Sequence, residues 1–365
     1  MISFVWSSKY PFWSGNGGSE RYTAGHIREL MRRGIPTRLL TLGHGKLDGR
    51  TDFPDITFQE LPSKAALSKL DDTLVFVTYP VHVDTTRQSY AILHCPGTSC
   101  AEADPLFDAA GATDKTLITP SRFAAHMWGT YFGRQLAKVP VVYPFAEACF
   151  GQVARPKRRG AKTRILFAGR LTPDKGIYTL LASLHMGAMR KLSYRLSVTT
   201  ACSHPEEGKI IRALVEAHPL VDVVPAQRTP EDMARLMAQY DVVVIPSTNL
   251  FWKEAFGIIS VEAQHAGCRV VASNGGGLPE TDCGGLILVD PDNPEALAEG
   301  IAKAASLGPL TAAERALAAT KFTVKASVDA LLQVIADEGR QAMQKVQPRT
   351  GAGEAAAAGG QLQPA

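Results

Sequence analysis

Residues 241–262 read DVVVIPSTNLFWKEAFGIISVE, and this stretch decides the fold. The four β-branched residues at 242–245 predict a buried strand. Further along, Phe256, Ile259 and Ala263 recur at helical spacing, which predicts a helix over residues 257–266. A buried strand followed by a helix is the repeating unit of an α/β protein with a parallel sheet.

The same alternation of strands and helices runs through the rest of the chain. In the first half, strands are expected at 2–6, 37–42, 73–79, 91–94 and 116–119, and helices at 20–33 and 121–132. In the second half, strands are expected at 164–168, 194–199, 221–224, 242–245, 269–272 and 286–289, and helices at 176–184, 209–217, 230–238, 257–266 and 294–305. Two successive α/β units are therefore predicted, and such sheets bind ligands at the carboxyl ends of their strands.

A polar, basic segment separates the two units. Residues 153–164, VARPKRRGAKTR, carry five Lys or Arg side chains between Arg155 and Lys162, together with Pro156 and Gly160, which is typical of a solvated linker. Contact with acidic lipid headgroups is the alternative for this segment. The predicted organisation is a Rossmann-like domain at 1–145, a linker at 146–162, a second Rossmann-like domain at 163–322, a helix at 323–345 that packs back toward the N-terminal domain, and a disordered tail at 346–365.

Composition narrows the class of protein. A chain of 365 residues is longer than a single domain with one hydrophobic core usually is, so two domains are expected. A net charge of +4 gives no argument for nucleic acid as a partner. No stretch has the roughly 18 apolar residues that cross a bilayer, and the N-terminus reads as a first strand and not as a secretory signal. The six cysteines form no C-x-x-C or Cys/His pattern, so they indicate buried thiols in a reducing cytosol and not a zinc site.

Glu254 and Glu262 lie on either side of the start of the predicted helix. The first N–H groups of that helix have no intrahelical partners, and Gly257 allows close approach, so they form a seat for phosphate. The two carboxylates are about 12 Å apart along the helix, a separation that lets them touch opposite ends of a nucleotide-sugar. The alternative is that Glu254 only favours the helix dipole and that Glu262 is exposed.

Two glycine-containing loops follow other strands. FAGRLTPDKG at 167–176 places Arg170 and Lys175 between a strand and a helix, where two cations suit a diphosphate; a solvated basic loop is the alternative. SGNGGSERY at 14–22 places Gly17 and Gly18 where backbone N–H groups cradle phosphate or sugar. This loop is not G-x-G-x-x-G, and no acidic residue ends the second strand, which argues against an NAD-dependent oxidoreductase.

In their order and spacing, the motifs of this chain resemble family 4 of the retaining glycosyltransferases. That family has the GT-B fold, in which two Rossmann-like domains face each other across a cleft, and the likeness covers residues 1–343. The E-x7-E pair with the preceding GR-x4-KG is the specific part of the pattern. The motifs are GGSE at 17–20, AILH at 91–94, TPSRF at 119–123, GRLTPDKG at 169–176, IPS at 245–247, the E-x7-E pair Glu254 and Glu262, and GGLPE at 276–280.

The resemblance implies a role for each matching residue. Arg170 and Lys175 would hold the donor diphosphate, and Glu262 would bind the ribose hydroxyls. Glu254 would grip the hydroxyls of the transferred sugar and stabilise its oxocarbenium-like charge, with His94 close by in the cleft. A core histidine is the alternative for His94, because Cys95 follows it where the family has a polar residue. The remaining expected donor contacts are Gly17, Gly18, Phe256, Gly257, Ile258 and Ile259.

The resemblance also implies chemistry that needs neither a cofactor nor a metal, because Arg170 and Lys175 can neutralise the leaving group. A D-x-D motif at 290–292, which binds a metal in other glycosyltransferases, directly precedes a predicted helix. We expect Asp292 or Asn293 to cap that helix instead.

These features predict a retaining hexosyltransferase that moves a hexose from a UDP- or GDP-linked sugar to a hydroxyl of a glycan, a lipid-linked acceptor or a small molecule. A GT-B-fold nucleotide-sugar epimerase and a non-catalytic nucleotide-sugar-binding protein are the alternatives. Aromatic residues at 10–13 and the bulky stretch 251–253 depart from the family pattern and leave the donor and the acceptor open. Recognition of the base is expected near residues 226–228.

We expect a cytoplasmic protein, and peripheral contact with the acidic inner face of the membrane is a further hypothesis. That hypothesis rests on arginines of the first helix and on two aromatic residues of the 121–132 helix, namely Arg21, Arg28, Arg32, Arg33, Trp128 and Phe132.

Overall fold

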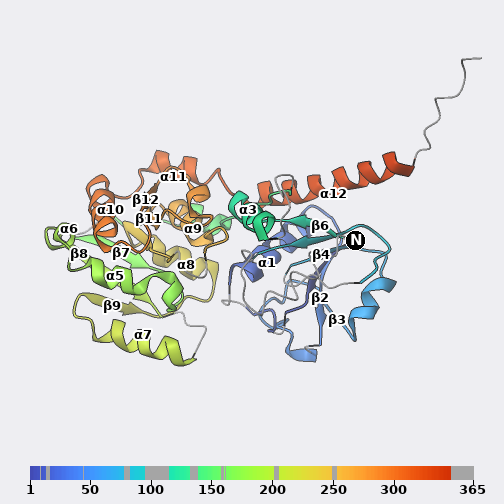
Figure 1. The fold of residues 1–365 in the computed structure, drawn as a ribbon, viewed down its shortest axis with the longest axis horizontal. Helices are drawn as coiled ribbons and strands as arrows, with labels where there is room; N and C mark the ends of the chain where they lie inside the picture. Colours follow the sequence, from blue (N-terminus) through green and yellow to red (C-terminus); the bar gives the residue numbers. More distant parts are fainter. Residues whose placement is uncertain are drawn as a thin grey trace, which may run out of the picture.

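The computed structural model describes residues 1–346 except 9, 14–16, 44, 78–82, 95–114, 132–138, 158–159, 161, 201–204 and 249–252. The chain forms two lobes side by side, each built on one sheet (Figure 1). The ends of two predicted elements, residues 78–79 and 132, and most of the predicted tail lie outside the described residues.

The sheet of the N-terminal domain has the strand order β3-β2-β1-β4-β5-β6, and its strands pair in parallel. The central strand β1 is buried along its whole length, which explains its apolar sequence. The strands are β1 (Ile2–Trp6), β2 (Thr37–Leu42), β3 (Phe58–Leu61), β4 (Thr73–Phe76), β5 (Ser89–Ile92) and β6 (Lys115–Ile118).

The sheet of the C-terminal domain repeats this topology with the order β12-β11-β10-β7-β8-β9, again in parallel. Both sheets thus have the doubly wound Rossmann order. In this order the second and third strands lie on one side of the first strand, and the remaining three lie on its other side. The predicted α/β class with two Rossmann-like domains is confirmed. The strands are β7 (Thr163–Phe167), β8 (Tyr194–Thr199), β9 (Val221–Val224), β10 (Val242–Ile245), β11 (Arg269–Ser273) and β12 (Leu286–Val289).

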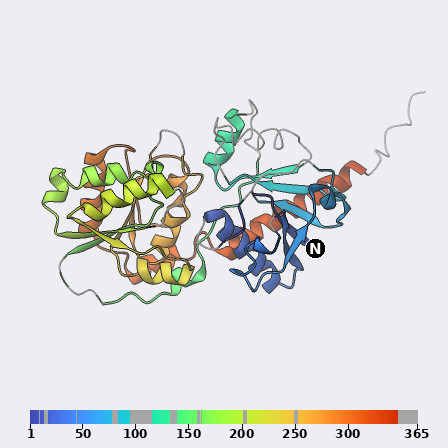
Figure 2. The same cartoon turned by 90° about the horizontal axis from the view of Figure 1, so that it is seen from below.

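Helices connect the strands and cover the sheets (Figures 1 and 2). They are α1 (Gly18–Arg32), α3 (Arg122–Tyr131), α4 (Ala148–Gln152), α5 (Ile177–Ser183), α6 (Gly187–Arg190), α7 (Pro205–Ala217), α8 (Pro230–Met237), α9 (Ile258–His265), α10 (Pro294–Leu307), α11 (Ala312–Ala318) and α12 (Val324–Val346). Short 3-10 turns are η1 (Gly45–Leu47), η2 (Lys64–Lys69), η3 (Pro173–Lys175) and η4 (Leu278–Thr281).

Strand β3 and helix α11 were not predicted from the sequence, nor were the short helices α4 and α6 and the 3-10 turns. Strand β3 lies at an edge of its sheet, and only Leu61 of its four residues is buried, so its sequence FQEL lacks a strand signal. Helix α11 did carry a signal, because Thr311 and Glu314 form a capping box. The pattern of a threonine followed three residues later by a glutamate could therefore have located it.

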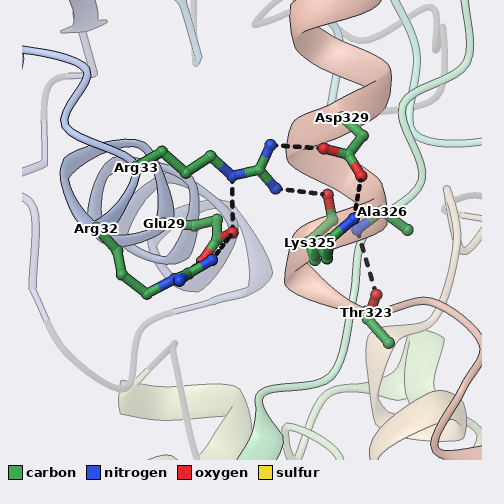
Figure 3. Close-up of polar contacts among 7 residues, drawn as sticks. All are labelled: Glu29, Arg32, Arg33, Thr323, Lys325, Ala326 and Asp329. Atoms are coloured by element: carbon green, nitrogen blue, oxygen red, sulfur yellow. Dashed lines mark hydrogen bonds and ion pairs between the residues drawn. The ribbon is translucent and has the colours of Figure 1, made fainter.

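Helix α12 returns from the C-terminal domain and lies against α1 of the N-terminal domain (Figure 1). Val328 and Leu331 are fully buried in the core of the N-terminal sheet. Beside them, the guanidinium of Arg33 binds Asp329 Oδ1 at 2.5 Å and the carbonyl of Lys325 at 3.1 Å (Figure 3). The same guanidinium donates to Glu29 of its own helix at 2.8 Å, so apolar burial and a charged contact together fix α12.

The chain crosses between the domains twice, and the two crossings run side by side. Ala146 N donates to the carbonyl of Phe322 at 3.1 Å, and Ala146 forms an isolated parallel bridge with Thr323. No helix of the described residues is both long enough and apolar enough to cross a membrane.

Candidate active site

A cavity of about 440 Å³ lies between the two domains. Residues that follow β1, β5 and β6 line it from the N-terminal side, and residues that follow β7 and β10 line it from the C-terminal side. Strands β7 and β10 are neighbours at the point where the strand order of their sheet reverses, which is where doubly wound sheets bind ligands. The cavity is large enough for a small organic ligand.

All the site residues predicted from the sequence except Glu262 line this cavity. They are Gly17, Gly18, His94, Arg170, Lys175, Glu254, Phe256, Gly257, Ile258 and Ile259. Of the stretch expected to recognise the base, Gln227 and Arg228 line it as well.

Lys175 and Glu254 form an ion pair inside the cavity. Lys175 Nζ lies 2.5 Å from Glu254 Oε1, and the Ser247 hydroxyl donates to the same oxygen at 3.0 Å. Burial opposes ionisation of Glu254, but the charge and hydrogen bond of Lys175 outweigh it and lower the pKa of the carboxyl. Glu254 is therefore an anion held in a fixed orientation, and not merely a surface carboxylate near a helix dipole.

The loop that carries Lys175 is fixed by close contact with the end of β10. Gly176 has a φ of 72°, and a Cβ at this position would lie 1.7 Å from the carbonyl oxygen of Pro246. Only glycine fits such a backbone contact. Thr248 N also donates to the carbonyl of Asp174 at 2.9 Å. The cation thereby keeps a defined position relative to the strand end.

Helix α9 presents its N-terminus to the cavity. Its N-cap is Gly257, with a φ of 96°, and no side chain in the described part of the chain caps it. A Cβ at Gly257 would lie 2.5 Å from Leu278 Cδ2, so the close packing of this turn also requires glycine. Unpaired N–H groups at a helix start favour an anion, which agrees with the predicted phosphate seat.

Glu262 lies one turn further along α9, is only 2% exposed and does not line the cavity. The alternative that it is an exposed surface residue is therefore wrong. Its Oε1 accepts a hydrogen bond of 2.6 Å from Arg21 Nη1 of α1, in the other domain. Burial raises the pKa of Glu262 to about 7 although the Arg21 charge opposes the rise, and Oε2 has no hydrogen-bond partner among the described residues.

Arg21 is a residue that the sequence reasoning did not place in the site. It lines the cavity and contacts Glu262 across the domain boundary, 241 positions along the chain. It directly follows the GGSE motif, whose expected position at the cleft could have indicated Arg21 as a site residue. The neighbouring sequence does not indicate which carboxylate Arg21 contacts.

His94 follows β5, at the cavity wall. Its ring lies edge-on to Tyr22, with the ring centres 4.8 Å apart. Burial, with a smaller effect from His26, lowers the pKa of His94 to about 3, so the imidazole is neutral. Its Nε2 is buried and has no hydrogen-bond partner among the residues that the structure describes. The His94 ring is therefore packed against Tyr22 like a core residue, and it also lines the cavity.

The D-x-D motif at 290–292 ends at a helix cap. The side chain of Asn293 accepts a hydrogen bond of 3.0 Å from Ala296 N at the start of α10, which confirms the predicted cap. Within the described ranges, no group of three or more His, Cys, Asp or Glu residues could hold a metal ion. Cys149, Cys268 and Cys283 are free thiols, and the other cysteines lie outside those ranges.

The arginines on which the membrane hypothesis rests are each paired with a carboxylate. Trp128 is buried at 1% exposure, and Phe132 lies outside the described residues. Trp128 is therefore not part of an exposed aromatic surface, whereas the paired Arg28 and Arg32 are 40% and 68% exposed. The pairs are Arg21–Glu262, Arg28–Asp55, Arg32–Glu29 and Arg33–Asp329.

The aromatic residues at 10–13 and the bulky stretch 251–253 were named above as departures from the family pattern. Tyr10 and Trp13 are exposed at 56% and 46%, whereas Phe12 is buried. Residues 251–252 lie outside the described ranges.

Residues 162–306 match the family described as Glycosyl transferases group 1. The D-inositol 3-phosphate glycosyltransferase of Corynebacterium kroppenstedtii is 35% identical over 141 residues, which cover 36% of this chain and only 30% of that protein. A glycosyltransferase from Rickettsia africae has a similar structure, with a TM-score of 0.71 at 18% identity over 91% of this chain and 97% of that one. HepE of Anabaena, solved in complex with UDP and glucose, gives a TM-score of 0.65 at 18% identity over 92% and 99%.

The likeness in structure extends over both domains, whereas the family match is confined to the second. Assignment to family 4 in particular stays a prediction. The two doubly wound sheets, the cavity at their carboxyl ends and the similar solved structures lead to one conclusion: the chain has the GT-B fold, and its residues 162–306 match the glycosyl transferases group 1 family.

Proposed function

We propose that the chain is a retaining hexosyltransferase that uses a nucleotide-diphosphate sugar. The observation that carries this proposal is the gathering of Arg170, Lys175, Glu254 and the uncapped start of α9 around one cavity between the domains. Two cations and a helix N-terminus suit a diphosphate, and an anionic carboxylate beside them suits a sugar that becomes positively charged.

In the proposed reaction, the bond between the anomeric carbon and the leaving phosphate oxygen breaks. The acceptor oxygen forms its new bond from the same face of the sugar, so the anomeric configuration is retained. The proton of the acceptor hydroxyl passes to the leaving phosphate oxygen, which leaves a nucleoside diphosphate as the second product. No separate general base is required for this step.

Arg170 and Lys175 would stabilise the charge on the departing diphosphate. Charge-assisted hydrogen bonds contribute about 1.5–3 kcal/mol each, so the two together supply about 3–6 kcal/mol. Enzymes lower barriers by about 8–23 kcal/mol, so these cations need help from the N–H groups at the start of α9 and from orientation of the acceptor. The same cations make a divalent metal unnecessary in this proposal.

Glu254 is proposed to contact the transferred sugar. Its lowered pKa supports an anion that accepts hydrogen bonds from sugar hydroxyls and favours oxocarbenium-like charge. Glu262 is proposed to bind the ribose with Oε2, which has no hydrogen-bond partner in the described part of the chain. Because Arg21 lines the cavity and Glu262 does not, the Arg21 side chain has to shift when a ribose reaches Glu262.

Two similar proteins indicate which donors and acceptors to test first. HepE was solved with UDP and glucose, so UDP-glucose is the first donor to test, with GDP-linked sugars next. The name of the Corynebacterium relative makes inositol phosphate one small-molecule acceptor to include beside glycans and lipid-linked acceptors.

The experiment is incubation of the protein with candidate donors, with and without acceptors, followed by analysis of the products. A glycosylated acceptor with the anomeric configuration of the donor, seen by NMR, is the expected result. Release of nucleoside diphosphate without any glycosylated acceptor would mean hydrolysis. A new nucleotide-sugar would indicate the epimerase instead, and binding without any product would indicate a non-catalytic binding protein.

A cytoplasmic location and contact with acidic membrane also stay predictions. Flotation with vesicles of phosphatidylserine and phosphatidylcholine at low salt tests the contact, because electrostatic binding to anionic lipid weakens as salt increases. Absence of the protein from the vesicle fraction would dismiss it.

A further inference from the structure

Glu280 belongs to η4 of the C-terminal domain, but its carboxylate binds groups of the other half of the molecule. Oε1 accepts a hydrogen bond of 2.7 Å from Phe123 N, and Oε2 accepts one of 2.9 Å from Arg122 N. These are the first N–H groups of α3, which have no intrahelical partners and favour a negative charge. The Tyr143 hydroxyl adds a third hydrogen bond, to Oε2 at 2.8 Å.

The loop that leads to Glu280 also holds the backbone around Glu254. Gly277 N donates to the Glu254 carbonyl at 2.8 Å. Gly276 has a φ of 61°, and a Cβ there would lie 2.5 Å from the same carbonyl oxygen. A Cβ at Gly277 would lie 2.3 Å from the carbonyl oxygen of Ala255. The glycine pair therefore allows this loop to lie directly on the chain at 254–255.

The start of α3 reaches the same stretch of chain from the opposite domain. The Ser121 hydroxyl accepts a hydrogen bond of 2.9 Å from Ala124 N and donates to the Ala255 carbonyl. One end of one helix thus contacts both Glu280 and the residue next to Glu254. These contacts form a closed loop between the domains.

Tyr143 attaches the first chain crossing to the same place. Its ring centre lies 5.6 Å from that of Phe256 and 5.4 Å from that of Phe322, which is on the second crossing. Burial and the neighbouring Glu280 raise the pKa of Tyr143 to about 12, so its hydroxyl stays a donor at ordinary pH.

We propose that Glu280, with Tyr143, is a positioning residue that couples contact between the domains to the orientation of the chain at 254–256. This inference rests on the proposed function, in which Glu254 contacts the transferred sugar. When the domains meet, α3 holds Glu280 and Ser121 holds Ala255, so Glu254 is fixed from two sides. Glu280 itself is not among the residues that line the cavity.

The test compares Glu280→Gln and Tyr143→Phe with the wild type. The matched control is Glu295→Gln, an exposed glutamate in the first turn of α10. Glu280→Gln keeps the size of the side chain but loses its charge and one of its two acceptors. We expect kcat to fall at least about tenfold, with donor KM and nucleoside diphosphate affinity within about twofold of wild type. That split separates coupling from local damage to the donor site.

If Glu280→Gln fails to fold, Tyr143→Phe serves as the test variant. It removes only one hydroxyl, so a smaller fall in kcat is expected. Combining the two changes should lower kcat by less than the product of their separate effects, because both residues belong to one network. The control should leave all three quantities unchanged.

Hydrogen exchange gives a readout that is independent of turnover. The amides of Arg122 and Phe123 should exchange faster in Glu280→Gln than in wild type, and unchanged exchange would overturn the proposal. Unchanged kcat in a folded Glu280→Gln protein, or equal losses of kcat and nucleotide affinity, would also overturn it. If the wild type transfers no sugar, the proposed function fails, and exchange alone decides whether Glu280 joins the domains.

Discussion

The ammonium of Lys175 lies 2.5 Å from the carboxylate of Glu254, so two residues with different predicted roles form one ion pair. One is expected at the donor diphosphate and the other at the transferred sugar. The contact joins the loop after β7 to the segment before α9, which are 79 positions apart in the sequence. In the proposed reaction the ammonium would lie beside the leaving diphosphate and the carboxylate beside the transferred sugar, the two groups that separate.

Replacing either member of this pair should abolish most of the turnover while the fold remains. Loss of one preorganised charged group costs about a hundredfold to a thousandfold in kcat, and we expect this for both Lys175→Ala and Glu254→Ala. Steady-state rates with the identified donor measure the effect. Lys303→Ala, at an exposed position on α10, is the control and should keep the normal rate. Near-normal rates in both site variants would remove the assigned site.

Nucleoside diphosphates should stabilise the protein without a divalent metal. A ligand at 100 times its dissociation constant adds about 2.7 kcal/mol to the free energy of unfolding. We expect UDP or GDP to raise the Tm, and the corresponding nucleoside to do so much less, because Arg170, Lys175 and the start of α9 are proposed to bind the phosphates. Thermal denaturation with and without EDTA measures this. A shift that requires added metal would contradict the metal-free proposal.

The stability effect of Glu262→Gln should depend on pH. The pKa of Glu262 is raised from 4.5 to about 7, mainly by burial. An acid whose pKa rises on folding stabilises the folded state fully below its unfolded pKa, and this contribution is lost as pH rises through about 7. Glutamine stays neutral, so between pH 5 and pH 8 the variant should gain relative to wild type, by up to about 3 kcal/mol.

Urea unfolding of both proteins across this pH range checks the prediction, with Glu295→Gln as an exposed control that should show no trend. A stability difference that stays constant from pH 5 to pH 8 would show that Glu262 is ionised throughout. The raised pKa would then be wrong.

Helix α12 should be fixed to α1 mainly by buried apolar contacts. Leu331 is fully buried, and its truncation to alanine should lower the free energy of unfolding by about 2–5 kcal/mol. Arg33→Ala removes the bonds to Glu29, Asp329 and Lys325 drawn in Figure 3. Arg33 and Glu29 are only 20% and 10% exposed, but Glu29 keeps its pair with Arg32 and Asp329 keeps its pair with Lys325, so this change should cost about 1–2 kcal/mol. Equal losses in the two variants, measured by urea unfolding, would contradict this ranking.

Much of the fold could be predicted because the sequence pattern is local. Strands β2, β8, β9, β10 and β12 have the bounds that were expected, since each apolar run stops at a turn. β3 was missed because a half-exposed edge strand of mixed polarity does not differ from a loop in sequence. Its pairing with β2 supplies the strand, and that pairing is a tertiary contact.

Most of the cavity could also be predicted, because its residues follow strands in recognisable motifs. Arg170, Lys175 and Glu254 line the cavity as expected, and all lie at carboxyl ends of strands or at the start of a helix. Glu262 was placed in the donor site by its spacing from Glu254, but its burial away from the cavity could not be read from the sequence. It depends on how α1 of the other domain packs against α9.

The sequence by itself determined the two doubly wound sheets and the loops that line the cavity between them, because hydrophobic periodicity and glycine-rich turns act over a few residues. Only the tertiary structure decided that Arg21 meets Glu262 and that Glu280 caps α3. Both contacts cross from one domain to the other. They are set by the relative orientation of the domains, which depends on the whole interface and leaves no mark in any short stretch of sequence.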